Sequence, residues 1–244
     1  MKRSSIMKTI GAAFIMLISA TMFQSCLDND SHQYVNAIVT VKPLDGNQAF
    51  YMQLDDSTTL WADNLAKSPF GDKEVRALVI YEVLDSAKDG YDQSVLLSSI
   101  DSVLTKKTVV TMGDKEADNA KYGNDPVEIV NDFTTVVEDG YLTLRFRVEM
   151  GMGNTTHLMN LVTGTNPENP YEVVFHHKIE NGDMASGMYP PMYGDGIVAF
   201  RLNSLPDTKG EKVKLTVRWN SFQGEKSHDF TYCTRPSDRE ENAQ

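Results

Sequence analysis

The sequence predicts an all-β protein, and two observations carry this prediction. From residue 34 onward, apolar and polar residues alternate with a period of two, which is typical of strands that bury one face. Asp-Gly pairs at 45–46, 89–90 and 139–140 separate these runs. Such pairs favour tight hairpins, because Gly readily adopts the positive φ that the turns need. We therefore expect antiparallel strands arranged in barrels or sandwiches.

The alternation is clearest in three segments. In residues 141–150, every second side chain is apolar, from Leu142 to Met150. Residues 212–219 alternate Val, Leu and Trp with Lys, Thr and Arg, and residues 75–83 alternate with a second face that is itself partly apolar. No stretch of the mature chain shows a strong helical stripe over three turns, although residues 94–104 are ambiguous between helix and strand.

Residues 1–25 have the features of a lipoprotein signal peptide. A basic start precedes an apolar run at 9–23, which is shorter than the roughly 20 residues that span a bilayer as a helix. The run ends in Phe23-Gln24-Ser25-Cys26, which resembles a lipobox with the small residue Ser25 before the cysteine. We expect cleavage before Cys26 and acylation, of the palmitate type, on its sulfur. A plain signal peptide or a short membrane anchor is the alternative.

Acylation of Cys26 would hold the chain firmly on a membrane. Each buried CH₂ contributes about 0.8 kcal/mol, and two or more acyl chains give stable attachment. Acidic residues follow at once, with Asp28 and Asp30 in a predicted flexible tether over 26–33. They resemble the surface-export signal of Bacteroides-group lipoproteins. We expect an outer-membrane lipoprotein and favour display on the cell surface over a periplasmic orientation.

The charge of the chain argues against nucleic acid as a partner. The formal net charge is −11, and loss of the three basic residues of the signal peptide takes it to −14. Nucleic-acid affinity comes largely from Lys and Arg that displace counterions from phosphates, so a surface this negative disfavours it. A loose basic contact with anionic lipid is disfavoured for the same reason.

A shift in composition divides the mature chain. Residues 112–126 are polar and show no alternation, which indicates a linker. It separates a first domain at 34–111 from a second at 127–234, and both sizes suit small β-domains. The last residues, 235–244, are predicted to be a disordered tail.

The mature chain resembles the NigD-like lipoproteins of Bacteroides and Prevotella relatives over nearly its whole length. Five segments carry the resemblance: Leu54–Trp61, Val103–Lys107, Gly123–Val127, Tyr141-Leu142 and His157–Val162. Each is unspecific alone, but their order and spacing together are specific. This chain departs from the family at Ser57, where Gly is usual, and at His176-His177-Lys178, where Arg-His-Asn is usual.

The resemblance implies an N-terminal OB-like barrel followed by a C-terminal antiparallel β-sandwich. The family takes its name from a protein encoded with a bacteriocin, for which an immunity role has been supposed. It has no established catalytic residues, so none are carried over to this chain. OB folds often bind oligonucleotides or oligosaccharides, but a fold alone does not establish a ligand.

Histidines form the one cluster that could carry chemistry. In a strand, His177 would share a face with Val173 and Phe175, while His176 would point the other way. His157 begins another strand-like run, and Asp183 follows after a short turn. Zinc would need three or four such groups to converge, and adjacent residues on opposite faces are poor co-ligands. We therefore predict hydrogen-bonded structural histidines, and no catalytic, cofactor-binding or metal residues.

Two further features each allow two interpretations. Residues 184–196 mix Met, Tyr, Pro and Gly in a long loop that suits either a recognition surface or packing onto its own domain. Cys233 has no partner in the chain if Cys26 is acylated. We expect it to be a small buried hydrophobic residue, with an intermolecular thiol role as the alternative.

Three functional hypotheses follow. The first is a non-enzymatic binding or protection protein of the cell envelope, with bacteriocin immunity included, acting on an unknown protein or glycan ligand. The second is an accessory glycan-binding lipoprotein, which would need exposed aromatic platforms; the available side chains are Trp61, Trp219, Tyr189 and Tyr193. The third is a metal-dependent hydrolase that uses His157, His176 or His177 with Asp183, and it fails if these side chains lie far apart.

Overall fold

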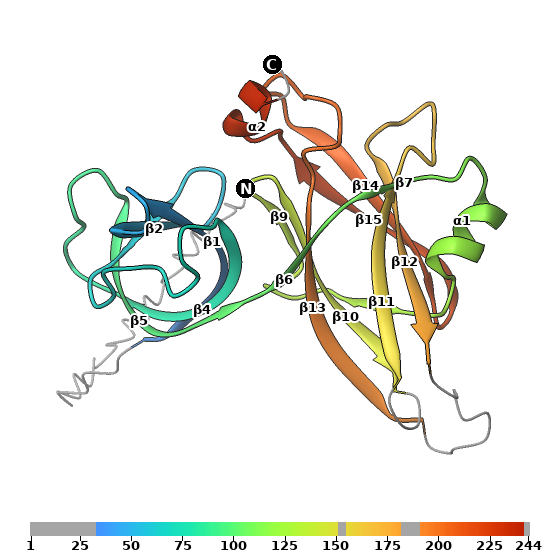
Figure 1. The fold of residues 1–244 in the computed structure, drawn as a ribbon, viewed down its shortest axis with the longest axis horizontal. Helices are drawn as coiled ribbons and strands as arrows, with labels where there is room; N and C mark the ends of the chain where they lie inside the picture. The colour runs from blue at the N-terminus through green and yellow to red at the C-terminus, as the bar shows by residue number, and fades with distance from the viewer. Residues whose placement is uncertain (1–32, 151–154, 182–190, 242–244) are drawn as a thin grey trace, which may run out of the picture. The chain divides into compact units, whose positions relative to one another are not determined.

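The computed structural model describes residues 33–150, 155–181 and 191–241. The predicted signal peptide, Cys26 and most of the tether lie outside these residues, as do Asp183 and Tyr189. Within the described ranges the chain is almost entirely strand and turn (Figure 1), so the all-β prediction is confirmed. None of the helices described there has the length and apolar character needed to cross a bilayer.

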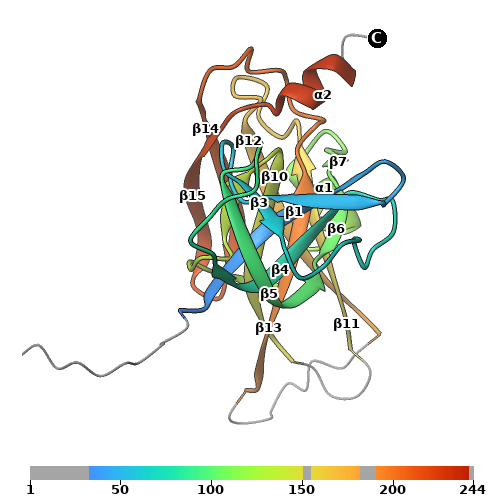
Figure 2. The same cartoon turned by 90° about the vertical axis from the view of Figure 1, so that its left-hand side faces the viewer.

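The first five strands close into a barrel, which confirms the OB-like part of the prediction. They are β1 (Val35–Leu44), β2 (Ala49–Gln53), β3 (Thr59–Ala62), β4 (Val75–Val83) and β5 (Gln93–Ser102). Their order around the barrel is β1-β2-β3-β5-β4, with β3 and β5 parallel. In Figure 2 these strands, coloured blue and green, face the viewer. Inward-facing side chains such as Val39, Phe50 and Leu60 fill the interior and are almost fully buried.

The remaining strands form the two sheets of a β-sandwich, as predicted. One sheet contains β6 (Leu104–Lys107), β8 (Glu128–Val130), β9 (Val136–Glu138), β10 (Tyr141–Glu149) and β13 (Tyr193–Arg201). The other has the order β15-β14-β12-β11-β7, from β15 (Gly224–Tyr232), β14 (Val213–Ser221) and β12 (Glu172–Glu180) to β11 (Thr156–Thr163) and β7 (Val109–Val110).

Side chains from both sheets meet in one apolar core. Leu142 and Leu144 of β10 and Phe200 of β13 come from the first sheet, and Phe175 of β12 and Leu215 of β14 come from the second. The alternation in 141–150 and 212–219 therefore reports real burial, because every second residue of β10 and β14 faces this core.

Two predicted Asp-Gly turns join antiparallel neighbours. Asp45 and Gly46 lie between β1 and β2 with φ of 49° and 65°, and Asp139 and Gly140 lie between β9 and β10 with φ of 48° and 76°. Asp139 and Gly140 form a two-residue loop, and positive φ at both of them matches the twist of a tight hairpin, whereas the loop after β1 is longer and has a third positive φ at Asn47.

The structure differs from the sequence-based expectation in three segments. Residues 112–126, expected to be a linker, contain helix α1 (Lys115–Tyr122), and residues 104–110 pair with strands of the sandwich. The ambiguous segment 94–104 is strand, in β5 and the start of β6. Residues 236–241 of the expected tail form helix α2 (Pro236–Glu241).

Candidate functional site

Helix α1 covers the outer face of the second sandwich sheet, beside β12 (Figure 1). The Asp114 side chain accepts a hydrogen bond of 2.8 Å from the amide of Ala117 and so caps the first turn. Gly123 ends the helix with φ of +90°, and its amide donates to the carbonyl of Asn119. The helix is polar, with Asp118 and Tyr122 as its buried residues.

Three hydrogen bonds fix this helix and its ends to the sheets. The Nδ1 atom of His176 donates to the carbonyl of Gly123 at 2.6 Å, and the hydroxyl of Tyr122 donates to the carbonyl of Val110 at 2.8 Å. The Nδ2 atom of Asn220 donates to the carbonyl of Asn124 at 2.7 Å. These bonds connect the end of the helix and the residues after it to β7, β12 and β14.

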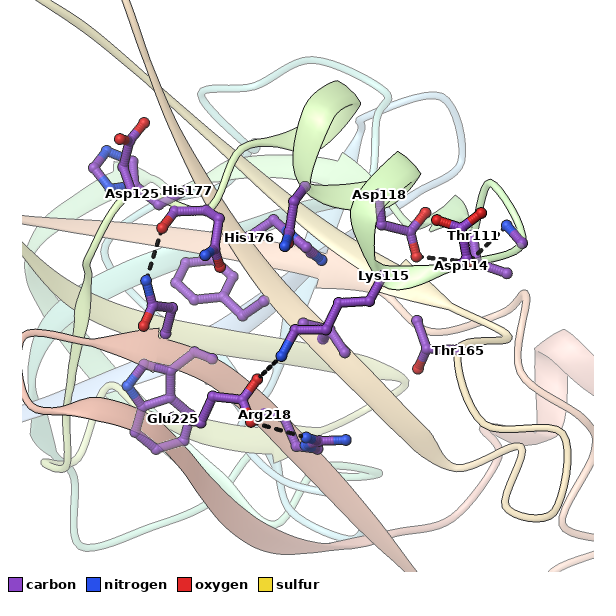
Figure 3. A pocket seen from close by; sticks show the side chains of 17 residues that line it. Thr111, Asp114, Lys115, Asp118, Asp125, Thr165, His176, His177, Arg218 and Glu225 are labelled. Carbon is purple, nitrogen blue, oxygen red and sulfur yellow. Dashed lines mark hydrogen bonds and ion pairs between the residues drawn. The ribbon is translucent and has the colours of Figure 1, made fainter.

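A pocket of about 140 Å³ lies between α1 and the sheet (Figure 3). Its lining comes from α1 and the segments just before and after it, from residues of β12, β14 and β15, and from Thr165 in the loop after β11. Val174 provides apolar wall, whereas Asn119, Thr165 and His176 provide neutral polar groups.

Charged side chains at the rim are paired with one another. Lys115 extends from α1 to the carboxylate of Glu225 on β15, as Figure 3 shows. Arg218 pairs with the same carboxylate at 3.4 Å and with Glu172 at 3.1 Å. Lys115 lowers the pKa of Glu225 below its usual value through this hydrogen bond and its charge. Exposed pairs of this kind contribute little to stability, but they cross the space between the helix and the sheet.

Asp118 lines the same pocket and is almost fully buried. Its two carboxylate oxygens each accept a hydrogen bond of 2.6 Å, from the hydroxyl of Thr111 and from the amide of Met112. A buried carboxylate needs such donors to offset lost hydration. The group therefore ties the start of α1 to the preceding loop.

The structure places the histidines as their sequence predicts. His176 and His177 point to opposite faces of β12, the first toward α1 and the second toward β11. The Nδ1 atom of His177 donates to the carbonyl of Pro126 at 3.0 Å, so its Nε2 accepts from Nδ1 of His157 at 2.9 Å. The Nε2 atom of His157 is then left as an acceptor, buried and without a hydrogen-bond partner among the described residues.

Burial lowers the pKa of both His157 and His177, and in His177 the charge of His157 lowers it further. The folded chain thus disfavours the protonated rings more than the unfolded chain, in which His titrates near 6.5. At a pH where the rings are neutral in both the folded and the unfolded chain, burial of these rings carries no such penalty. The loss of stability grows as pH falls below about 6.5, because the unfolded chain then binds protons more readily.

We therefore expect the free energy of unfolding to fall as pH is lowered from 7 to 5. His157→Asn keeps a donor for Nε2 of His177 but removes one titrating ring, so the loss between these pH values should be smaller. Urea unfolding of both proteins at pH 7 and pH 5 measures this difference. If both proteins lost the same free energy of unfolding between pH 7 and pH 5, the paired rings would not control the pH dependence of stability in this range.

The histidines do not form a metal site in the described part of the chain. There, no three His, Cys, Asp or Glu side chains come close enough to hold a metal ion. His157 and His177 are adjacent, but His176 lies on the other face of the sheet, and Asp183 lies outside the described residues. The arrangement shown is that of hydrogen-bonded histidines on two neighbouring strands, β11 and β12.

A second candidate surface lies on the barrel. Tyr51 of β2 and Trp61 of β3 occupy outward-facing positions, and Tyr91 from the loop before β5 packs against both, with ring centroids 5.8 Å and 4.9 Å away. We call these three residues the aromatic cluster. The ammonium of Lys88 lies 3.2 Å from the centroid of the Trp61 ring. All three aromatic residues are half-buried.

The other aromatic residues singled out in the sequence have different environments. Trp219 is buried in the sandwich core, whereas Tyr193 is 51% exposed and packs edge-on against Phe222. Burial of every candidate aromatic platform would remove a glycan-binding role. Since Tyr193 is exposed, that condition is not met. Of the predicted loop 184–196, residues 191–196 are described, and Met192 is exposed. The expectation of a loop was wrong for residues 193–196, because they pair with β10 as the start of β13. Cys233 is half-buried, and its sulfur accepts a hydrogen bond from the hydroxyl of Thr208.

The pocket under α1 has no counterpart among the sequence-based predictions. Its polar groups come from segments far apart in the chain, and the helix that covers it has no apolar stripe. The signal that could have revealed this helix is the capping residue Asp114 followed by a run of good helix formers and closed by Gly123.

An OB barrel joined to a β-sandwich defines a two-domain, all-β class of protein. Family models agree: the NigD-like N-terminal OB domain matches residues 38–103, and the NigD-like C-terminal beta sandwich domain matches residues 108–232. The chain belongs to the NigD-like family, which confirms the resemblance seen in the sequence. No curated protein matches it.

Solved structures of similar proteins share the fold. A protein from Parabacteroides distasonis named as toxin-related is 31% identical, with 86% of this chain and 98% of that chain covered and a TM-score of 0.64. A NigD-like immunity protein from Bacteroides caccae is 18% identical (84% and 99% covered, TM-score 0.53). A protein from Bacteroides fragilis named as a lipoprotein is 14% identical (83% and 99% covered, TM-score 0.55). The last two likenesses show the fold alone.

Proposed function

We propose that this chain is a non-enzymatic binding protein of the cell envelope, held to the outer membrane by lipid on Cys26, and that it protects its cell by capturing a toxic molecule. The observation that carries the proposal is the covered pocket, because a pocket with unmet hydrogen-bonding groups and an apolar wall suits binding. The described histidines lack the convergence that hydrolysis by a metal site requires.

Two further observations support this proposal. A structural neighbour of 31% identity is named as toxin-related, and the lipobox-like Phe23–Cys26 agrees with attachment to the envelope. The acidic residues after Cys26 favour display on the cell surface, where an incoming toxin would first be met.

A protection assay tests the function. Cells without the gene would carry the parent chain, the Cys26→Ala chain or an empty vector, and would be exposed to bacteriocin-containing supernatants from related strains. We expect more survivors with the parent chain than with either control, because both binding and location are needed. Equal survival in all three, or hydrolysis of the toxin by the purified chain, would contradict a binding role.

Glycan binding is the alternative, and the aromatic cluster favours it. Outward Tyr and Trp residues on β2 and β3 occupy the face that OB folds use for oligosaccharides. OB folds also bind oligonucleotides on this face, but the excess of carboxylates over basic residues in this chain disfavours such polyanionic ligands. Retardation of the chain in a gel that contains neutral polysaccharide, lost on Trp61→Ala, would favour this alternative over toxin capture.

A further inference from the structure

The aromatic cluster of the barrel already holds a positive charge on one of its rings. The ammonium of Lys88 lies 3.2 Å from the centroid of the Trp61 ring, which places it directly over a face of the indole. The ring of Tyr91 adjoins that of Trp61, and the ring of Tyr51 adjoins that of Tyr91. The face of an aromatic ring is negative and attracts cations, and aromatic cages recognise ammonium groups through this attraction. The cluster therefore has the chemistry of an ammonium site.

Lys88 takes this position although its own loop is acidic. The loop between β4 and β5 contains aspartates at positions 85, 89 and 92. In the described part of the chain, the ammonium of Lys88 nevertheless has the ring of Trp61 as its partner and forms no ion pair with a carboxylate. The ring, rather than a neighbouring carboxylate, is thus the place where this positive charge is held.

The side chain of Lys88 can leave the ring without disturbing its loop. The backbone is held separately, because the amide of Lys88 donates to the hydroxyl of Ser94 at 3.1 Å and its carbonyl accepts from the amide of Tyr91 at 3.0 Å. Lys88 is exposed, and cation–π pairs at exposed sites are weak. Another ammonium can therefore take its place on the ring.

Carboxylates beside the cluster favour a cation over a neutral ligand. Asp92 accepts hydrogen bonds of 2.8 Å and 2.7 Å from the amide and hydroxyl of Thr59, which lies two residues before Trp61 on β3. Asp55 lies close enough for its charge to act on Asp92. The whole chain has 34 acidic residues against 23 basic ones, so a basic partner approaches it through an attractive field. A sugar stacked on the same face of Trp61 would have to displace Lys88 without supplying a charge in its place.

We propose that the aromatic cluster binds the ammonium of a lysine side chain in a basic polypeptide partner, and that Lys88 occupies this site until the partner displaces it. A basic polypeptide fits, because it supplies an ammonium for Trp61 and further positive charges for the acidic loop. The site belongs to the barrel alone. It requires neither the lipid on Cys26 nor the pocket under α1, so its failure would leave the function proposed above untouched.

Calorimetric titration of the full chain, purified in detergent, tests the site. The probe is a short peptide of alternating glycine and lysine at physiological salt, and its matched control is the same peptide with acetylated lysines. We expect saturable binding of the lysine peptide alone. Trp61→Leu should lower this affinity by about 2- to 5-fold, although it leaves the net charge of the chain unchanged. Trp61→Phe should lower it less, because the phenyl ring keeps a negative face.

Lys88→Ala removes the internal occupant and should strengthen binding of the lysine peptide. We expect a gain of about 2- to 5-fold over the matched control, the strength of an exposed cation–π pair. That control is Lys67→Ala, in the loop after β3. Lys67 is also exposed, so its removal changes the net charge of the barrel equally but leaves Lys88 on the ring of Trp61.

Three results would overturn the proposal. They are equal affinity of the parent and Trp61→Leu chains for the lysine peptide, no gain in Lys88→Ala beyond that in Lys67→Ala, and equal binding of the acetylated peptide. Binding of neutral maltoheptaose that depends on Trp61, without Trp61-dependent binding of the lysine peptide, would assign the cluster to a sugar instead. Urea midpoints of the same samples show whether each variant is folded. If Trp61→Leu unfolds, Trp61→Phe and Lys88→Ala decide the outcome.

Discussion

Gly123→Ala should lower the free energy of unfolding by about 3–5 kcal/mol, from the combined costs of backbone strain and overpacking. A Cβ at this position would lie 2.4 Å from both the carbonyl oxygen of His177 and the Cβ of Lys178. Neither atom is the end of a flexible side chain, so α1 or β12 has to move. The φ of +90° adds strain for any residue with a side chain. Urea unfolding at pH 7 measures the effect.

Gly113→Ala is the matched control, because Gly113 stands just before the same helix with φ of +110° and nothing within 4 Å of its added Cβ. It should cost about 1–2 kcal/mol from strain alone. Movement of α1 in Gly123→Ala should also break the bond from His176 and change the fluorescence of Trp219, which Gly113→Ala should leave unchanged. Equal destabilisation in the two variants would show that the close contact of Gly123 with β12 does not hold the helix in place.

The strands could be predicted because their burial is periodic. The segments 75–83, 141–150 and 212–219 became β4, β10 and β14, with their apolar side chains inside the barrel or the sandwich. The opposite directions of His176 and His177 follow from the same period of two.

The pocket could not be predicted, for two physical reasons. Helix α1 gains its stability from Asp114 at its start and from hydrogen bonds at its end, so its sequence lacks the apolar stripe that identifies most helices. The walls depend on the parallel pairing of β12 with β14, in which Glu172 faces Thr216 and Phe175 faces Trp219. Pairing between segments this far apart is not encoded in any local pattern.

Arg76 shows the same limit for a single residue. It alternates with apolar residues in β4, which suggests an outward, solvated side chain, yet it is fully buried. Its guanidinium donates to the hydroxyls of Thr40 and Thr143 and pairs with Glu138 at 3.5 Å. These partners come from three other strands, and only the assembled fold brings them together around the guanidinium of Arg76.

Cys26→Ala should abolish stable attachment of the processed chain to the membrane. At about 0.8 kcal/mol per buried CH₂, two or more acyl chains dominate any contact that an acidic ectodomain can make with lipid. Removing the single sulfur that carries them removes the whole of this contribution. Cys233→Ala, which alters the other cysteine of the chain, is the matched control and should leave attachment unchanged.

Labelling of growing cells with a palmitate analogue measures this attachment most directly. The parent and Cys233→Ala chains should carry the label and sediment with the outer membrane, and the Cys26→Ala chain should carry none. A parent chain without label, or a Cys26→Ala chain that is labelled as strongly as the parent, would contradict a lipid-anchored protein.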